Sequence, residues 1–332
     1  MSNHQFHMVR MSAARLVAPR TMIVEQVLAD GPSKGQVRVR LSGCGICASN
    51  IPSWQGRDWF TYPMAPGWLG HEGWGVIDAT GSEVKGLRVG DYVTLLSSNA
   101  YAEYDIAPAR NVVLLPGELQ DKPFPGEPLG CAMNIFRRSG IRSGQIVAIV
   151  GVGFLGSVLT QLAVNKGAEV IAISRRRFSR EVARRMGARH TLEMSDHNAI
   201  IESVRNITPN LCDVVIECTG EQWPLDLAGE LCRVRGRLVV AGYHQDSPRQ
   251  VNMQMWNWRG IDVINAHERD PRRYMRGIRQ AVSAVVQGQL DPCSLFTHHW
   301  RLEQLPQAME MMEHRPDGFV KGVIIMPPME RT

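Results

Sequence analysis

Short apolar runs alternate with amphipathic segments through the second half of the chain. The run Ile146–Val150 is continuous and rich in β-branched residues, which is typical of a parallel strand buried on both faces. A helical pattern follows the glycines at 151–156, and a second apolar run covers 169–173. The apolar positions of the helical pattern share one face: Leu155, Val158, Leu159, Leu162 and Ala163. These segments predict a strand–helix–strand unit.

The same alternation continues towards the C-terminus. Further strands are expected at 213–217, 237–241 and 261–265. Further helices are expected at 180–186, 198–206, 222–231 and 271–287. Strands that alternate with helices predict a doubly wound α/β fold around a parallel sheet.

The N-terminal part shows the two-residue alternation of half-exposed strands. Strands are expected at 13–27, 36–42, 89–93 and 102–106. The proline-rich segment 116–128 predicts a linker, and 300–327 predicts a helix followed by a strand. We therefore expect a parallel-sheet domain over 129–265 and a discontinuous β-rich domain over 1–128 and 266–332.

Composition excludes several classes of protein. The chain has 332 residues, of which 44% are hydrophobic, so it can bury two cores. No apolar run is long enough to cross a bilayer, and the first residues lack the apolar region of a secretory signal. The net charge of +5 is modest, and seven widely spaced cysteines do not suggest a disulfide framework. We expect a cytoplasmic protein with no membrane or nucleic-acid partner.

The glycines between the first strand and its helix form a G-x-G-x-x-G motif, 151–156, that includes Phe154 and Leu155. In this context the motif predicts a dinucleotide site. Gly151 permits the tight turn, Gly153 lets the backbone approach a pyrophosphate, and Gly156 lets helix and strand pack closely. The free amides at the helix N-terminus then face the phosphates. The alternative is an ordinary glycine-rich turn.

The end of the second strand bears on which dinucleotide is bound. An acidic residue there would hold a ribose 2′-hydroxyl, but this chain has Ser174 followed by Arg175 and two more arginines. A hydroxyl and guanidinium groups suit a 2′-phosphate, so NADP(H) is favoured over NAD(H). The alternative is a solvated basic turn on a helix surface.

Further motifs resemble a known family. They are Gly45-Ile46-Cys47-Ala48-Ser49-Asn50, Gly70-His71-Glu72, Val89-Gly90-Asp91, Glu127-Pro128-Leu129 and Phe319-Val320-Lys321-Gly322-Val323. With the glycine loop they resemble the medium-chain dehydrogenase/reductase superfamily, in its zinc-dependent alcohol and polyol dehydrogenase branch, over nearly all the chain. The resemblance implies a Rossmann domain and a β-rich, GroES-like catalytic domain.

The resemblance also implies one catalytic Zn²⁺. Cys47 and His71 fall on the first two ligand positions, and Glu127 falls on the third, with Cys131 as a competing candidate. Glu72 resembles a glutamate near the metal that can ligate in some states. A thiolate, an imidazole and a carboxylate would leave a fourth tetrahedral position open for substrate. Each residue alone also has a structural interpretation, such as a small buried cysteine.

Other roles are implied in the same way. Ser49 would act with Cys47 and His71 in catalysis by taking the alcohol proton, and Lys321 would contact the dinucleotide pyrophosphate. Ala266 is expected at the nicotinamide because it follows the last strand of the parallel sheet.

The chain departs from the family pattern at three places. Asn50 stands where Asp is usual, Pro52 replaces a relay histidine, and 94–101 contains no cysteine, so no structural zinc is expected. Asn keeps an acceptor but loses the charge that raises ligand basicity.

Together these features predict an oxidoreductase that transfers a hydride between NAD(P) and a secondary alcohol or ketone, of polyol or sugar type. The alternatives are a zinc-free NADPH-dependent reductase of the same fold and a non-catalytic dinucleotide-binding protein. Nucleic-acid binding through the arginine cluster is the weakest alternative, and a homo-oligomer is expected from the resemblance.

Overall fold

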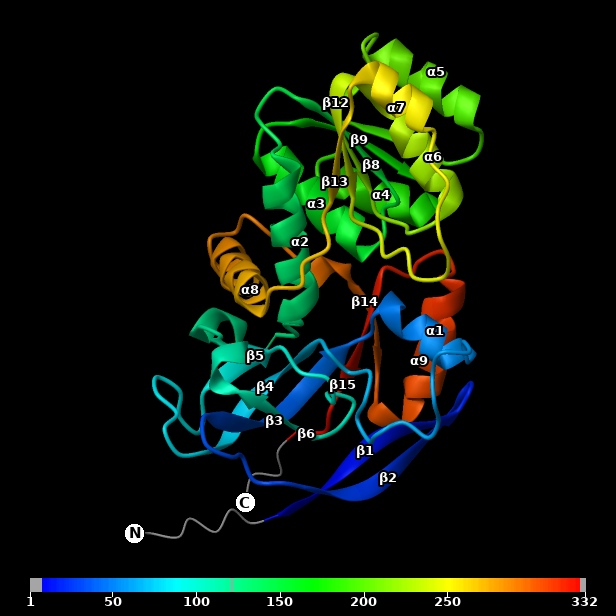
Figure 1. Ribbon diagram of the computed structural model, residues 1–332. Coiled ribbons are helices and arrows are strands. Elements are labelled where there is room, and N and C mark those ends of the chain that lie inside the picture. Colours follow the sequence, from blue (N-terminus) through cyan, green and yellow to red (C-terminus); the bar gives the residue numbers. More distant parts are fainter. Residues whose placement is uncertain (1–7, 121, 329–332) are drawn as a thin grey trace. The chain divides into compact units, whose positions relative to one another are not determined.

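The chain folds into two compact units, which are visible in the computed structural model of Figure 1. The structure describes residues 8–120 and 122–328. Unit 1 comprises Met1–Gly130 and Phe296–Thr332, and unit 2 comprises Cys131–Leu295.

The second boundary differs from the expected division at 265/266. Residues 266–295 belong to unit 2. Helix α8 (Pro271–Val286) buries Met275, Ile278 and Ala281, and the amide of Asp291 donates to Gln161 Oε1 at 2.7 Å. The sequence pattern placed this segment in the β-rich domain because the parallel strands end before it.

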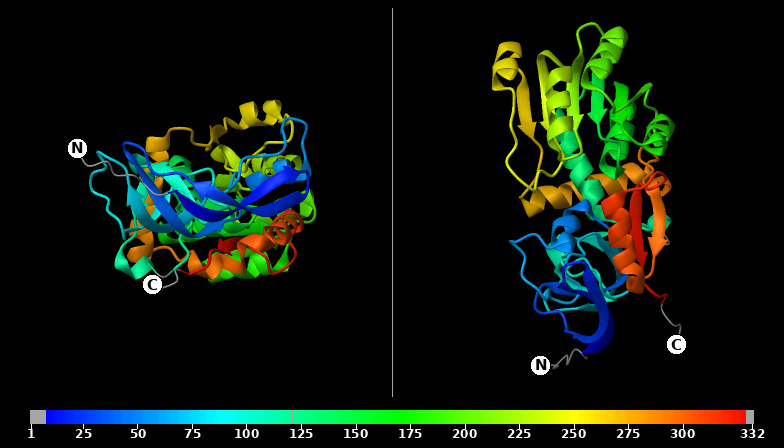
Figure 2. Two further views of the ribbon diagram at one scale, coloured as in Figure 1. Left: turned by 90° about the horizontal axis from the view of Figure 1, so that it is seen from below. Right: turned by 90° about the vertical axis from the view of Figure 1, so that its right-hand side faces the viewer.

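Unit 2 is built on a parallel sheet, as the alternating pattern predicts. In the described residues of this unit the strand order is β10-β9-β8-β11-β12-β13. The strands are β8 (Ile146–Val150), β9 (Glu169–Ser174), β10 (His190–Glu193), β11 (Cys212–Glu217), β12 (Cys232–Val240) and β13 (Asp262–Asn265). They run in one direction, which is clearest in the right-hand view of Figure 2. The order reverses between β8 and β11, the position at which open α/β sheets bind ligands beyond their strand ends.

Helices precede, connect and follow these strands, and most of them contribute to two cores. They are α2 (Gly126–Ser139), α3 (Phe154–Asn165), α4 (Arg177–Arg185), α5 (His197–Ile207), α6 (Gln222–Leu231) and α7 (Met253–Arg259), with α8 beyond the last strand. On β8, Val147 and Ile149 join one core, and Ala148 and Val150 join the other. The strand is therefore buried on both faces, which explains its continuous apolar run.

Unit 1 contains a mainly antiparallel sheet and a long hairpin. The sheet order among described residues is β14-β15-β3-β4-β5-β7, with β6 paired to β3. Its strands are β3 (Gln36–Gly45), β4 (Gly73–Thr80), β5 (Tyr92–Leu95), β6 (Tyr104–Pro108), β7 (Val112–Leu114), β14 (Phe296–Trp300) and β15 (Lys321–Ile325). The hairpin of β1 (Val9–Ala18) and β2 (Thr21–Ala29) appears in dark blue in Figures 1 and 2. Among the described residues, helices α1 (Ile51–Gln55) and α9 (Leu305–His314) lie wholly in this unit, and α2 begins in it.

One strand of unit 1 is less exposed than its alternation predicts. Val37, Val39 and Leu41 are buried as expected, but Arg38 is also only 5% exposed. Its guanidinium lies 2.8 Å from Asp78 Oδ2 on β4, so an ion pair compensates for its burial. Over the described ranges, no helix is long and apolar enough to cross a membrane.

Candidate functional site

Three of the expected metal ligands come together in unit 1. A sulfur, a ring nitrogen and a carboxylate oxygen, from Cys47, His71 and Glu72, all lie within 4.8 Å of one another. Cys47 precedes the short helix Ala48–Asn50, and the other two residues precede β4. A Cβ at Gly45 would lie 1.8 Å from Glu72 Oε2, so the carboxylate can occupy this place only beside a glycine. This donor set suits zinc.

The His71 ring is oriented by a backbone carbonyl. His71 Nδ1 lies 2.8 Å from the oxygen of Leu69, which can only accept, so Nδ1 carries a proton. Nε2, 3.5 Å from Ser49 Oγ, is then the nitrogen available to a metal. Leu69 has a φ of 82°, a costly conformation for a branched residue, and this turn directs its carbonyl to the ring.

Asn50 acts on this histidine indirectly, through the carbonyl of Leu69. Its Nδ2 donates to the same Leu69 oxygen at 3.1 Å, and its Oδ1 accepts from the Tyr101 hydroxyl at 2.8 Å. The amide therefore fixes the carbonyl that fixes the ring. A charged aspartate could not donate to that carbonyl.

The charges around His71 outweigh its burial. Burial alone lowers the pKa of His71, but the hydrogen bond and charge of Cys47, with the charges of Glu127 and Glu72, raise that pKa to about 10. These charges favour the protonated imidazole, and a metal bound at Nε2 would take the place of that proton.

Glu72 and Lys321 form a buried ion pair that the sequence did not predict. Their side chains are 0% and 5% exposed, and Lys321 Nζ lies 2.6 and 2.7 Å from the carboxylate oxygens and 2.9 Å from the oxygen of Ile46. Burial lowers the pKa of Lys321, but the charges of Glu72 and Cys47 raise it overall. The expected contact of Lys321 with a pyrophosphate stays a prediction, and the structure gives its ammonium a different partner.

The third metal ligand stays a prediction. Glu127 lies in the first turn of α2, and its charge is among the causes that raise the pKa of His71. It is not one of the three residues whose ligand atoms cluster. Cys131, one turn further along α2, places its sulfur 3.5 Å from the hydroxyl of Tyr274 in unit 2.

The glycine loop of unit 2 has the conformation that a pyrophosphate site requires. Gly151 has a φ of 96°, and a Cβ at Gly156 would lie 2.2 Å from the oxygen of Gly151. A Cβ at Gly153 would meet no heavy atom within 4 Å, so the loop is open where a phosphate would approach. Gly153 is the N-cap of α3 and has no side chain, so no cap side chain covers the start of the helix, where a phosphate would bind. The loop fits a dinucleotide pyrophosphate.

The turn after β9 is held by one arginine. Arg180 Nη1 donates to the carbonyls of Ser174, at 3.0 Å, and Arg175, at 2.7 Å, and Nη2 lies 3.0 Å from Glu193. Arg177 pairs with Glu181 on its own helix, so part of the arginine cluster is helix surface. Ser174 is buried at the strand end and Arg175 is exposed. Their contact with a ribose phosphate stays a prediction.

Ala266 directly follows β13, as expected, and is 1% exposed. Its amide donates to the oxygen of Val240 at 2.9 Å. The next residue is His267, whose ring stacks on that of Tyr243 with centroids 5.6 Å apart. These two residues follow the neighbouring strands β13 and β12. The nicotinamide contact of Ala266 stays a prediction.

Comparisons with known proteins agree with these features. The family model for the alcohol dehydrogenase GroES-like domain matches residues 33–117, and the model for zinc-binding dehydrogenase matches residues 155–283. A sorbitol dehydrogenase of Halalkalibacterium halodurans is 25% identical over 311 residues, which are 83% of this chain and 88% of that protein. An alcohol dehydrogenase of Geobacillus stearothermophilus is 29% identical over 88% of this chain and 91% of its own length.

A solved structure matches nearly the whole chain. It is described as a zinc-binding dehydrogenase from Sinorhizobium meliloti 1021 bound to NADP. Its TM-score is 0.83 at 25% identity, over 96% of this chain and 99% of that one.

Proposed function

Because the chain belongs to the medium-chain dehydrogenase/reductase superfamily, in its zinc-dependent alcohol dehydrogenase branch, we propose that it transfers a hydride between NADP(H) and a secondary alcohol or ketone of polyol or sugar type. The observation that carries the proposal is the cluster of Cys47, His71 and Glu72 in a chain that also has an open glycine loop. The substrate class rests on the polyol dehydrogenase relatives.

Cys47 and His71 would hold zinc, with Glu127 as the third ligand and Glu72 as an alternative carboxylate. A bound zinc supplies Lewis acidity, which polarises a substrate oxygen and favours loss of its proton. The carbonyl of Leu69 keeps Nε2 of His71 available to the metal. Lys321 balances the charge of Glu72, so a second carboxylate near the site does not add an uncompensated negative charge.

Ser49 would accept the proton of the alcohol at Oγ and pass it towards solvent. Its hydroxyl lies 3.5 Å from His71 Nε2, the ring nitrogen that is available to a metal. A hydroxyl can accept one proton while it donates another, as a relay requires. The hydride chemistry belongs to the dinucleotide, and the protein positions it.

The glycine loop would bind the pyrophosphate, and Ser174 and Arg175 would contact the 2′-phosphate. Ser174 does not repel a phosphate, and an arginine beside it can form charge-assisted bonds. Ala266 would contact the nicotinamide.

The test is a screen of polyols, secondary alcohols and ketones with both NADP⁺ and NAD⁺ or their reduced forms, on protein purified without a metal column. We expect turnover of a polyol with NADP⁺ and bound zinc. Turnover of a ketone or an activated double bond without zinc would favour the zinc-free reductase. Dinucleotide binding without turnover of any compound would favour the binding protein.

A further inference from the structure

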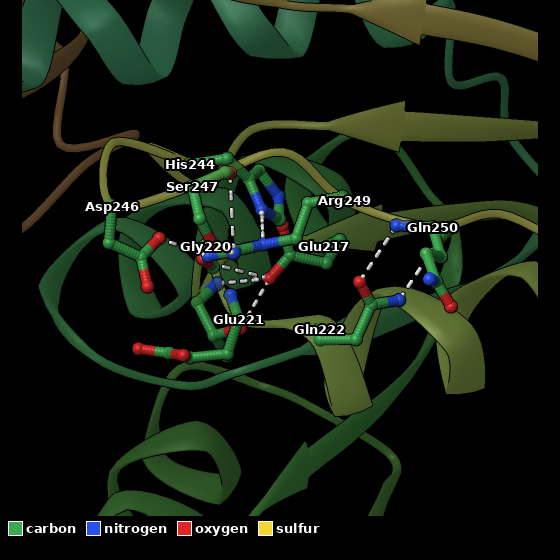
Figure 3. A network of polar contacts seen from close by, with 10 residues as sticks. Glu217, Gly220, Glu221, Gln222, His244, Asp246, Ser247, Arg249 and Gln250 are labelled. Carbon is green, nitrogen blue, oxygen red and sulfur yellow. Dashed lines mark hydrogen bonds and ion pairs between the residues drawn. The ribbon is translucent and has the colours of Figure 1, made fainter.

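A polar network joins the loops that follow β11 and β12 in unit 2, and no role for it was evident from the sequence. Figure 3 shows this network around Glu217, the last residue of β11. The main contributors besides Glu217 are His244 and Arg249, from the loop after β12. Loops at these strand ends usually bind ligands rather than stabilise the sheet.

Glu217 binds the loop that follows it. Its side chain is 0% exposed. Oε1 accepts from the amide and hydroxyl of Thr219, both at 2.5 Å, and from the amide of Gly220 at 2.9 Å. Burial would raise the pKa of Glu217, but these bonds and that of His244 lower it, so the carboxylate is charged.

His244 links that carboxylate to Arg249 and has a defined tautomer. Arg249 Nε donates to His244 Nδ1 at 2.9 Å, and arginine has no acceptor, so Nδ1 is unprotonated. Nε2 therefore carries the proton and donates to Glu217 Oε2 at 3.0 Å. Arg249 Nη2 also donates to the oxygen of Gly220 at 2.6 Å, so the two loops are joined at both ends of the network.

The backbones of the two loops also lie very close together at two glycines. A Cβ at Gly220 would lie 2.6 Å from the oxygen of Tyr243, and a Cβ at Gly242 would lie 2.2 Å from the amide nitrogen of Gly220. The same Cβ at Gly242 would lie 2.6 Å from Glu217 Oε2. The two backbones therefore approach so closely that only glycine fits at both positions.

The loop after β11 touches the glycine loop directly. The amide of Cys218 donates to the oxygen of Val150, the residue before the glycine loop, at 2.8 Å. A Cβ at Gly151 would lie 2.5 Å from Thr219 Cγ2, so the threonine packs against the first glycine of the motif. β8 and β11 flank the point at which the strand order reverses. Thr219, held by Glu217, thus lies against the loop that is predicted to bind the pyrophosphate.

We propose that Glu217, His244 and Arg249 are positioning residues for the dinucleotide. They hold 218–220 against the glycine loop and join the loop after β12 to the same place. The network acts through the backbone that it holds, and it touches no reacting atom. This inference rests on the proposed dinucleotide-dependent function.

The chain offers a matched control for this network. His190 Nε2 lies 3.1 Å from Glu169 Oε1, which is another histidine–glutamate contact between neighbouring loops or strand ends in unit 2. Both residues begin their strands, so this pair lies at the amino edge of the sheet, away from the end where ligands bind. A loss of general stability would affect variants of both pairs, whereas a positioning effect would affect only the network.

The experiment measures dissociation constants for NADPH and NADH by fluorescence titration, and melting temperatures, for the unmodified protein and three variants. His244→Leu removes both bonds of the ring. His244→Gln keeps a donor for Glu217 and an acceptor for Arg249. His190→Leu is the control.

We expect His244→Leu to weaken binding of the preferred dinucleotide by about ten- to a hundred-fold, since a hydrogen bond to a charged group is at stake. His244→Gln should recover most of that loss, and His190→Leu should bind normally even if its melting temperature falls. If His244→Leu binds the dinucleotide as tightly as the unmodified protein, or if His190→Leu loses as much affinity as His244→Leu, this inference is wrong. The proposed function would not be affected by either result. An unmodified protein that binds neither dinucleotide would overturn the proposed function, and this inference with it.

Discussion

His71 and Glu72 are held in place by partners of different charge. The ring is fixed by the carbonyl of Leu69, which Asn50 holds by its amide hydrogen. The nearby Glu72 is instead balanced by a buried ammonium, that of Lys321. The histidine is thus held by neutral groups, the Leu69 carbonyl and behind it Asn50, and the charge of Glu72 is balanced by Lys321. This arrangement is compatible with binding of a divalent cation.

Replacement of Lys321 by methionine should destabilise the protein strongly. The Glu72 carboxylate would then stay buried without its counter-charge. We expect the free energy of unfolding to fall by about 3–5 kcal/mol. Lys34→Met is the control, because Lys34 and Glu83 form a pair that is 70% and 63% exposed. An exposed pair is worth about 0–1 kcal/mol. Denaturant unfolding measures the stability of both variants. Equal shifts of their unfolding midpoints from that of the unmodified protein would contradict the role of the buried pair.

The sequence could predict which residues form the cluster but not how they are held. Cys47, His71 and Glu72 stand in motifs with a fixed spacing, and the structure brings them together. Lys321 is 249 positions from Glu72, and their pairing depends on β15 lying next to β3. The Leu69 carbonyl depends on a left-handed turn at a residue that does not favour one.

At the scale of elements, the prediction was best where apolar runs are long. The strand and helix on either side of the glycine loop were expected, and β8 begins and ends as predicted. β10, β14 and α7 were missed. β10 and β14 are mostly half-buried and carry histidines, and α7 has no buried residue, so none of these elements has a clear apolar pattern.

The start of α2 decides which residue completes the metal site. Glu127 is in its first turn, in unit 1, and Cys131 begins the part of the chain that belongs to unit 2. We therefore expect Glu127→Ala to lower bound zinc more than Cys131→Ala does. Metal analysis of the two purified variants tests this, and a greater loss of zinc from Cys131→Ala would make the sulfur the third ligand.

The turn between β9 and α4 should determine dinucleotide preference. Ser174→Asp with Arg175→Ala would remove the proposed charge-assisted contact with the 2′-phosphate, worth about 1.5–3 kcal/mol, and would introduce repulsion of that phosphate. The ratio of kcat/KM for NADP⁺ to that for NAD⁺ should fall by roughly ten-fold to several hundred-fold, since 1.4 kcal/mol is a factor of ten. Kinetics with both dinucleotides test it. An unmodified enzyme that prefers NAD⁺ would mean that the arginines only cover a helix surface.

Glu217, at the end of β11, should make the stability of the protein depend on pH in the acidic range. The hydrogen bonds of His244, Thr219 and Gly220 lower the pKa of Glu217 against the effect of burial. A carboxylate with a lowered pKa in the folded state stabilises the protein above its unfolded pKa of 4.5, and this contribution disappears as pH falls through the lowered value. Glu217→Gln should therefore show a smaller loss of stability below pH 4.5 than the unmodified protein. Thermal unfolding between neutral and acid pH measures the slopes, and equal slopes would contradict this assignment.

At the scale of the whole molecule, the two units carry separate parts of the proposed chemistry. Unit 1 contains the clustered candidate metal ligands, and unit 2 contains the glycine loop and the network that we propose supports it. The boundary that the sequence misplaced lies after α8, because a helix beyond the last parallel strand has no periodicity that assigns it to one core or the other.

The zinc dependence of turnover tests the central claim most directly. Zinc would be removed with a chelator from protein purified without a metal column, and returned in steps while zinc content, dinucleotide affinity and turnover of the best substrate are measured. We predict no turnover without zinc, a rate that rises in proportion to zinc up to about one ion per chain, and a dinucleotide affinity that hardly changes. Full turnover by protein without zinc would contradict the account.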